Sequence, residues 1–357
     1  MKIIQENIIP TPCTSNHASN LLELDNGDLL CTWFGGSMEG TSDVSIYLSR
    51  YDAAQGTWNN PEKMSCDESR SEQNPALFRH PGGGLWLLYT AQIGADQGTS
   101  VVRLRKSPDN GASWSRSEDL FIEAGSFIRH APVVNASGEL LFPTWRSNMD
   151  NAFGDDASFV KISRDGGGSW ETVDVPESKG CVHMDIVENC QAAFFRRRVA
   201  DNIFRSVSRD NGQTWSRPEP TGLPNNNSSI QARLLADGRL AMAYNERRAT
   251  GGAGESSVPP WIQDKDAFLK QSKITEQSAV WGVPRNPLVI ATSTDLGVSW
   301  NKELVLESDA ALRSEHDRNG SFIGDYSYPS IIQAKDKTLH VTYSYLRDYI
   351  KHVVLSL

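Results

Sequence analysis

An eight-residue pattern, Ser-x-Asp-x-Gly-x-(Ser/Thr)-Trp, occurs four times in this chain of 357 residues. The copies run from Ser107 to Trp114, Ser163 to Trp170, Ser208 to Trp215 and Ser293 to Trp300, and a degenerate fifth copy spans Ser49 to Trp58. In such a turn Asp can bond the nearby amides, Gly can supply a positive φ, and Trp can pack between neighbouring sheets. Self-similarity of this kind is typical of a repeat architecture.

Short strands joined by tight turns surround the repeated motif. Apolar segments flank turn signals such as Asp25-Asn26-Gly27 and Asp237-Gly238, and a third strand then leads into each motif. Counting these units predicts an all-β fold, a six-bladed β-propeller with four-stranded antiparallel blades. The last unit, from Tyr326 onward, lacks the motif, and residues 2–9 are predicted to supply its outer strand.

The repeats run almost from end to end, so the sequence predicts one domain over residues 1–357. The third and fourth copies are farther apart than the others, because a Gly- and Ser-rich insertion lies at about 246–284. It falls between the second and third strands of one blade, where a loop can project without disturbing the packing. This insertion could form a lid or a subunit contact. Within it, residues 264–273 are the candidate for a helix.

The composition of the chain argues against several classes of binding partner. The net charge is −9 and no basic run is present, which argues against nucleic acid and against an anionic membrane surface. The N-terminus has no apolar signal region and no segment could span a membrane, so a cytoplasmic location is expected. Five scattered cysteines favour free thiols. No spacing of His, Asp or Glu predicts a metal site, and no cofactor is expected.

The repeated motifs resemble the Asp boxes of the sialidase (neuraminidase) superfamily, and within it the bacterial BNR-repeat sialidase-like proteins. The likeness covers essentially the whole chain. It implies a six-bladed propeller with the active site at the central mouth. Sialidases use a tyrosine nucleophile assisted by a glutamate, an aspartate acid/base and three arginines that bind the substrate carboxylate.

The resemblance places the nucleophile in the last blade. The segment 325–331 is similar to the one that presents the sialidase tyrosine, and its spacing to the following turn favours Tyr328, with Tyr326 as the neighbouring candidate. The acid/base position falls in the loop 35–43, where Glu39 or Asp43 could serve. The alternative role for Tyr328 is structural, as an aromatic side chain that packs in the core.

Two of the three arginine positions are also matched. Arg285 matches the third arginine, and the run Arg196-Arg197-Arg198 matches the second. Strand alternation puts Arg197 on the face opposite the other two, and the sequence does not decide which face is the mouth. Surface salt bridges are the alternative role for this run.

The remaining two positions depart from the sialidase pattern. His17 stands where the first arginine is expected, and His183 stands where the glutamate partner of the tyrosine is expected, two residues before Asp185. A carboxylate could still be bound through charge-assisted bonds from the remaining arginines.

Further polar residues gather at the starts of predicted inner strands. Arg129-His130 occupies this place in one blade, Gln73-Asn74 in another, and the run 225–229 in a third. Polar side chains that converge on a central mouth are what a sugar pocket needs. A structural role for each histidine is the alternative.

Two reactions and one non-catalytic role fit these residues. The first is an exo-acting glycoside hydrolase that releases a terminal acidic sugar, with Tyr328 as nucleophile and Glu39 or Asp43 as acid/base. The second is a lyase that cleaves a uronate linkage by β-elimination, with His183 or His17 as base and Tyr328 as acid. The third is a carbohydrate-binding propeller. Each predicts an acidic oligosaccharide or glycoside as partner, and the sequence leaves a homo-oligomer open.

Overall fold

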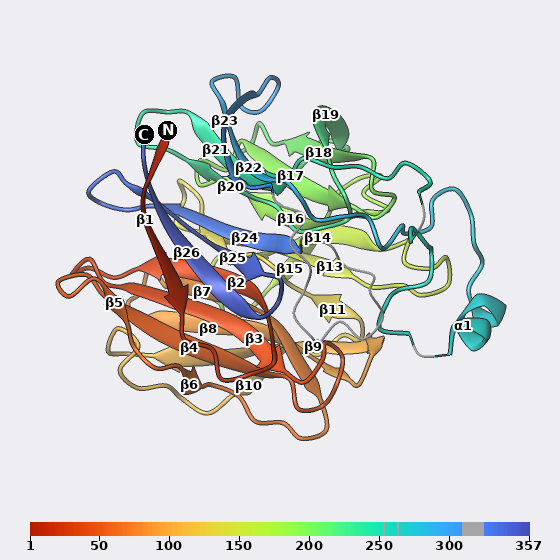
Figure 1. Cartoon of the computed structure of the whole chain (residues 1–357), viewed down its shortest axis with the longest axis horizontal. Coiled ribbons are helices and arrows are strands. Elements are labelled where there is room, and N and C mark those ends of the chain that lie inside the picture. The colour runs from red at the N-terminus through yellow and green to blue at the C-terminus, as the bar shows by residue number, and fades with distance from the viewer. Residues whose placement is uncertain (253, 263, 309–324) are drawn as a thin grey trace.

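Six antiparallel sheets, arranged as the blades of a β-propeller, make up the fold (Figure 1). The computed structural model describes residues 1–252, 254–262, 264–308 and 325–357. Each blade has four strands in a continuous path, and two blades carry one additional short strand. The predicted all-β, six-bladed propeller is therefore confirmed.

The first three blades follow one another in the chain. Blade 1 contains β2 (Ser15–Glu23), β3 (Leu29–Gly36), β4 (Ser45–Asp52), β5 (Thr57–Trp58) and β6 (Glu62–Lys63). Blade 2 contains β7 (Ser71–Arg79), β8 (Leu85–Ile93), β9 (Asp96–Ser107) and β10 (Glu118–Phe121). Blade 3 contains β11 (Ser126–Phe127), β12 (Val133–Val134), β13 (Leu140–Arg146), β14 (Ala157–Ser163) and β15 (Glu171–Asp174).

The other three blades complete the ring. Blade 4 contains β16 (Cys181–Ile186), β17 (Ala192–Arg197), β18 (Asn202–Val207) and β19 (Glu219–Pro224). Blade 5 contains β20 (Gln231–Leu234), β21 (Leu240–Asn245), β22 (Leu288–Ser293) and β23 (Asn301–Glu307). Blade 6 contains β24 (Tyr326–Gln333), β25 (Leu339–Tyr345), β26 (Tyr349–Ser356) and, from the other end of the chain, β1 (Lys2–Ile9).

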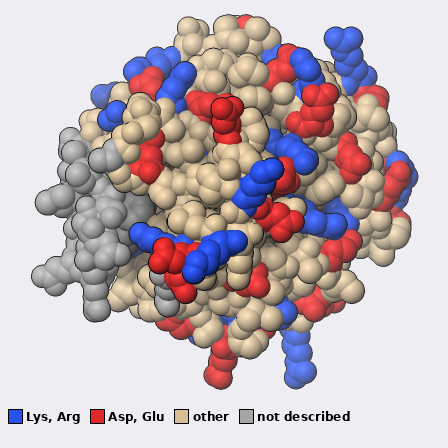
Figure 2. Space-filling model, turned by 90° about the vertical axis from the view of Figure 1, so that its right-hand side faces the viewer, with Lys and Arg blue, Asp and Glu red and all other residues tan. Residues whose placement is uncertain are grey.

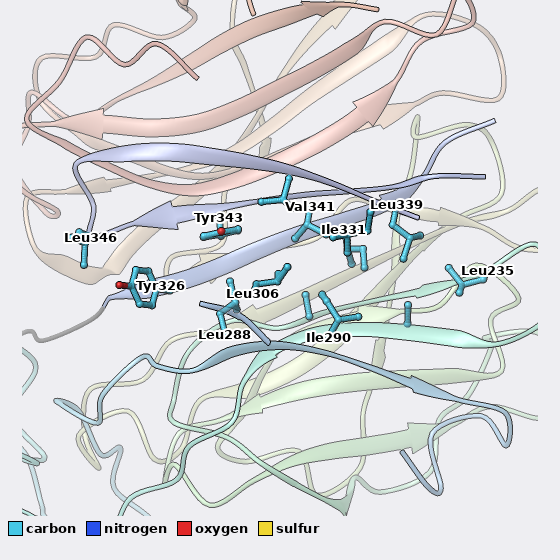
Figure 3. Close-up of a cluster of buried hydrophobic side chains, with 14 residues drawn as sticks. Leu235, Leu288, Ile290, Leu306, Tyr326, Ile331, Leu339, Val341, Tyr343 and Leu346 are labelled. Carbon is cyan, nitrogen blue, oxygen red and sulfur yellow. The ribbon is translucent and has the colours of Figure 1, made fainter. Parts of the chain in front are cut away.

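The N-terminal strand closes the ring as predicted. Strand β1 pairs antiparallel with β26, with Lys2 opposite Ser356 and Ile9 opposite Ile350. The two chain ends therefore lie together (Figure 1). Blade 6 packs on blade 5 through a buried cluster that includes Tyr326 and Ile331 (Figure 3).

Each repeated turn is held by its own side chains. In the third copy, Ser208 Oγ accepts from the Gly212 amide at 2.8 Å, and Asp210 Oδ1 accepts from the Thr214 amide at 2.9 Å. The other three copies make the same pair of bonds. The turn is thus satisfied locally, which explains why the motif recurs nearly unchanged in four blades.

The glycine of each turn also packs against the preceding blade. Gly212 has φ +84°, and a Cβ there would lie 2.1 Å from Leu141 Cδ1. The equivalent glycines, Gly111, Gly167 and Gly297, face Leu30, Trp86 and Phe194 of their preceding blades. Glycine is therefore required twice, for its backbone conformation and for the close approach between blades.

The segment between β21 and β22, residues 246–284, leaves blade 5 and reaches blade 3. Its helix α1 (Lys265–Gln271) begins after Asp264, whose Oδ1 accepts from the Ala267 amide at 2.9 Å. In Figure 1 the helix stands at the margin of the molecule. The segment shares a hydrophobic cluster with the β13–β14 loop: Ala152, Phe153, Phe268, Ala279 and Trp281 are buried in it.

Gly212→Ala should destabilise the fold more than the matched change Gly238→Ala. Both glycines have a φ near +85°, but nothing lies within 4 Å of a Cβ at Gly238. Backbone strain alone should cost about 1 kcal/mol at either position, and the clash with Leu141 should add about 1–3 kcal/mol at Gly212. Urea unfolding of both variants measures the difference, and equal losses would contradict this packing role.

Candidate active site

Four inner strands carry a β-bulge at the same place. The register shifts between His17 and Asn20, Gln73 and Ala76, Val182 and Asp185, and Ser327 and Ser330. One non-glycine residue in each bulge has a positive φ: Ala18 (59°), Asn74 (50°), His183 (52°) and Tyr328 (54°). Such a conformation is uncommon for residues other than Gly and Asn, and strained residues of this kind cluster at functional sites.

Tyr328 is the centre of a cluster of cationic and imidazole groups. Its ring centroid lies 4.1 Å from that of His17 and 5.6 Å from that of His183. The guanidinium carbons of Arg129, Arg196 and Arg285 lie 5.5, 5.6 and 5.4 Å from the ring centroid. We call these six residues the Tyr328 cluster. Five of the six blades contribute to it or border it, so the cluster lies where the inner strands converge.

Arg196 donates a hydrogen bond to the hydroxyl of Tyr328. Its Nη1 donates to Tyr328 Oη at 2.5 Å and also contacts His183 Nε2 at 3.3 Å. Its Nε donates to Asn227 Oδ1 at 2.7 Å, which fixes the guanidinium plane. The oxygen of Tyr328 therefore faces a positive charge directly.

Two arginines of the Tyr328 cluster have no carboxylate partner among the described residues. Arg129 and Arg196 are buried, and burial lowers the pKa of each to about 10. Neither forms an ion pair with a carboxylate among the described residues. Arg129 Nη2 instead donates to the carbonyl oxygens of Ser19 and Tyr328, at 2.9 and 3.2 Å. Buried cations without counterions favour an anionic ligand.

Both histidines of the cluster are held neutral. Burial, followed by the charge of nearby arginines, lowers the pKa of His17 and of His183 well below its usual value. A guanidinium only donates, so the nitrogen that faces it must accept: Nε2 of His183 toward Arg196 and Nε2 of His17 toward Arg347. The basic lone pair of each ring is thus already engaged.

Arg347 is a site residue that the sequence reasoning missed. Its guanidinium contacts Glu39 Oε2 at 2.6 Å, Asp325 Oδ2 at 3.2 Å and His17 Nε2 at 3.4 Å. Burial opposes it, but the two carboxylates raise the pKa of Arg347. Arg347 follows β25, and the pairing of this strand with β24 brings it beside Tyr328.

Glu39 joins the cluster through this arginine, and Asp43 does not. Asp43 Oδ2 accepts from the Ser37 amide at 2.9 Å, and its other oxygen accepts from the hydroxyls of Ser37 and Thr41. Asp43 is exposed and shapes its own loop. The structure therefore leaves Glu39 as the acid/base candidate of this loop.

Two further candidates lie away from Tyr328. Arg197 points to the other face of β17, as alternation requires, where its Nη1 donates to the Lys179 carbonyl at 2.6 Å and its guanidinium lies 4.7 Å from the Phe204 ring. Tyr326 is buried in the cluster between blades 5 and 6, with its ring 5.0 Å from that of Tyr345 (Figure 3). Both expectations of substrate contact are corrected by this placement.

The other polar residues of the inner strands bond to the scaffold. His130 Nδ1 lies 3.3 Å from Gln231 Nε2 and 3.5 Å from Asp185 Oδ1. Gln73 Nε2 donates to Ser71 Oγ at 2.9 Å, and Asn74 occupies the bulge of blade 2. They line the inner strands without a described contact to Tyr328.

Another hollow contains an arginine that carboxylates neutralise. A hollow of about 930 Å³ between blades 1 and 2 holds Arg103, which contacts Asp67, Glu72 and Asp119 at 2.9, 3.2 and 3.0 Å. On the face that carries α1, acidic and basic side chains are interspersed (Figure 2). Arg103, unlike Arg129 and Arg196, is therefore paired with carboxylates.

The part of the chain that the structure describes contains neither a cluster of candidate metal ligands nor a helix that could span a membrane. No three His, Cys, Asp or Glu residues lie together there as metal ligands would. The described helix is too short and too polar to cross a membrane.

A family match covers most of the chain. The chain matches the BNR repeat-like domain over residues 27–341, and it belongs to that family. No curated protein matches the sequence.

Solved structures with the same fold include several sialidases. The Hadza microbial sialidase Hz136 is 15% identical with a TM-score of 0.71, and 97% of this chain covers 66% of that one. The Trypanosoma rangeli sialidase is 13% identical with a TM-score of 0.67, and 96% of this chain covers 55% of it. The intramolecular trans-sialidase of Ruminococcus gnavus is 12% identical with a TM-score of 0.68, with 97% and 95% covered. At these identities the likeness shows the fold.

Acid should weaken the fold through its buried neutral histidines. His352 lies buried between blades 6 and 1, where burial lowers its pKa to about 3 and His340 Nδ1 lies 2.9 Å from its Nε2. Below pH ~6.5 His352 binds a proton in the unfolded chain but stays neutral in the folded chain. The free energy of unfolding therefore falls as the pH drops. Each such histidine contributes up to about 1.4 kcal/mol per pH unit.

The matched test is His352→Gln. This change should flatten the fall in unfolding free energy between about pH 6.5 and 5, measured by urea unfolding, because it removes one linked proton. A slope identical to that of the unchanged protein would contradict the assignment.

Proposed function

We propose that this protein is a glycoside hydrolase that removes a terminal carboxylate-bearing sugar. The proposal rests on the surroundings of Tyr328. This residue lies in a strained bulge, its Oη accepts a hydrogen bond from Arg196, and three arginines surround its ring. The arginines bind the carboxylate through charge-assisted hydrogen bonds, and the tyrosine oxygen is left facing the anomeric carbon.

In the first step Tyr328 Oη forms a bond to the anomeric carbon while the glycosidic C–O bond breaks. Glu39 takes up the proton that Tyr328 loses and gives it to the departing oxygen. In the second step Glu39 accepts a proton from water, the hydroxide attacks the anomeric carbon, and Tyr328 leaves as the phenolate beside Arg196. Glu39 then passes its proton to that phenolate. The enzyme is thereby returned to its starting protonation.

Arg347 couples substrate binding to this proton transfer. In the free protein it pairs with Glu39 at 2.6 Å. A substrate carboxylate that attracts Arg347 weakens this pair and frees the Glu39 carboxylate to contact the reacting groups. Substrate binding therefore prepares Glu39 for the first step.

A β-elimination remains the second reaction, since both histidines touch the tyrosine ring. It needs a histidine that accepts a proton, and both Nε2 lone pairs face an arginine. This engagement is why hydrolysis is the preferred proposal. Incubation with glycosides of sialic and uronic acids separates the reactions, because elimination yields an unsaturated, ultraviolet-absorbing sugar and hydrolysis does not.

Tyr328→Phe should abolish turnover of a terminal acidic glycoside, with a loss on the order of a thousandfold or more in kcat. Tyr349→Phe is the control, because β26 lies two strands away from β24 in the same blade. Steady-state release of the free sugar is the measurement. Unchanged turnover in Tyr328→Phe would remove this residue from the reaction.

Arg196→Gln should lower kcat/KM about 10- to 100-fold, because it removes a charge-assisted bond to the tyrosine and a positive charge for the carboxylate. Arg197→Gln, one residue away on the opposite face, should leave kcat/KM within about twofold. Equal effects of the two substitutions would contradict the orientation of the site.

A further inference from the structure

Arg196 is buried, and its hydrogen bond to Tyr328 Oη requires the guanidinium to keep one orientation. The arginine side chain has several rotatable bonds, so its surroundings must restrict it. A carboxylate partner is the usual way to hold a buried arginine. The described hydrogen-bond partners of Arg196 are the neutral side chains of Asn227, His183 and Tyr328, and no carboxylate is among them. Other groups therefore have to position this arginine.

One of these groups is the side-chain amide of Asn227, in the loop between β19 and β20. Its Oδ1 accepts from Arg196 Nε at 2.7 Å, and its Nδ2 donates to the Val280 carbonyl at 2.9 Å. Asn227 has φ +55°, a conformation that asparagine adopts more readily than most residues. The amide therefore connects the 246–284 segment to the Nε edge of the guanidinium.

The other group is the indole ring of Trp281. The guanidinium carbon of Arg196 lies 5.5 Å from the centroid of this ring, and that of Arg198 lies 5.2 Å from it. An aromatic face attracts a cation at such distances, most strongly where water is excluded, and Trp281 is only 5% exposed. Arg198 is also paired with Asp156, at 2.5 Å, whereas Arg196 is not. The ring thus stabilises Arg196 without neutralising its charge.

Backbone hydrogen bonds fix the place of the Trp281 ring. The Val280 amide donates to the Arg198 carbonyl at 2.8 Å, which ties the segment to the end of β17. The Trp281 amide donates to the Ser256 carbonyl at 2.8 Å, and the Ser256 amide donates back to the Trp281 carbonyl at 3.0 Å. The separation between the indole ring and Arg196 is therefore set by the packing of the 246–284 segment against blade 4.

We infer that Trp281 and Asn227 position Arg196, so that the packed 246–284 segment completes the site around Tyr328. Asn227 orients the guanidinium through Nε, the indole ring of Trp281 holds it in place, and Nη1 is left to donate to Tyr328 Oη. The catalytic consequence rests on the proposed hydrolase function, in which Tyr328 leaves as a phenolate beside Arg196. Both positioning residues act through Arg196 and not on the reacting atoms.

The direct test follows the Arg196 Nε–H group by NMR in the full chain. Its resonance is the Nε–H signal that is missing from Arg196→Gln. Trp281→Leu and Asn227→Gly should each speed the exchange of this proton with water about tenfold or more, because each removes one of the groups that hold the guanidinium. Glycine suits the positive φ of residue 227, so this change removes the amide without straining the backbone.

Phe268→Leu is the matched control. Phe268 is buried in the same hydrophobic cluster as Trp281, and no described arginine lies over its ring. This change should leave Nε–H exchange within about twofold. Trp281→Phe keeps an aromatic ring beside Arg196 and should restore most of the protection that Trp281→Leu loses. Equal acceleration by Phe268→Leu and Trp281→Leu, or none by Trp281→Leu, overturns the inference whether or not acidic glycosides are hydrolysed.

Turnover of the methyl glycoside of an acidic sugar gives a second reading. Trp281→Leu should lower kcat about tenfold and leave KM within about twofold, because Arg196 keeps its charge for the carboxylate but loses its orientation toward Tyr328. In an Arg196→Gln background the same change should have no further effect, and a further tenfold loss there would show a merely structural role and overturn the inference. Faster Nε–H exchange without turnover of any acidic glycoside contradicts the hydrolase proposal alone and supports the positioning of Arg196.

Discussion

The close approach of each repeated turn to the preceding blade is the constraint on which the architecture depends. Gly212 sits at a positive φ against Leu141, and three other blades repeat this contact with their own glycine. The serine and aspartate of the motif satisfy the turn, so no other residue has to bond its amides. Local satisfaction and close packing together let the same eight residues orient four blades, and β1 closes the ring by pairing with β26.

The ring brings one bulge from each of four inner strands toward the axis, and the site is built on these bulges. Tyr328 and His183 each occupy a left-handed conformation that a rigid sheet must impose. Arg129 crosses from blade 3 to accepting carbonyls in blades 1 and 6, so it links the inner strands as well as charging the site. The same residues therefore stabilise the centre of the propeller and give it affinity for an anion.

The repeated turns predicted the fold because they set the blade count. Through its resemblance to sialidases, the sequence also singled out Tyr328, His17 and His183. It could not predict that Asp43 caps its own loop, nor that Arg347 pairs with Glu39, 308 positions away in the chain. These contacts join segments that only the closed ring brings together. The packing of the 246–284 segment against the β13–β14 loop also joins distant parts of the chain.

The central claim is that Tyr328 reacts with an acidic sugar whose carboxylate the arginines hold. Mass spectrometry after incubation with a fluorinated acidic glycoside, which slows release of a covalent intermediate, tests this directly. The account predicts one sugar attached to the peptide that contains Tyr328, and no attachment in Tyr328→Phe. Attachment at another residue, or hydrolysis of acidic glycosides with no attachment at Tyr328, would contradict it.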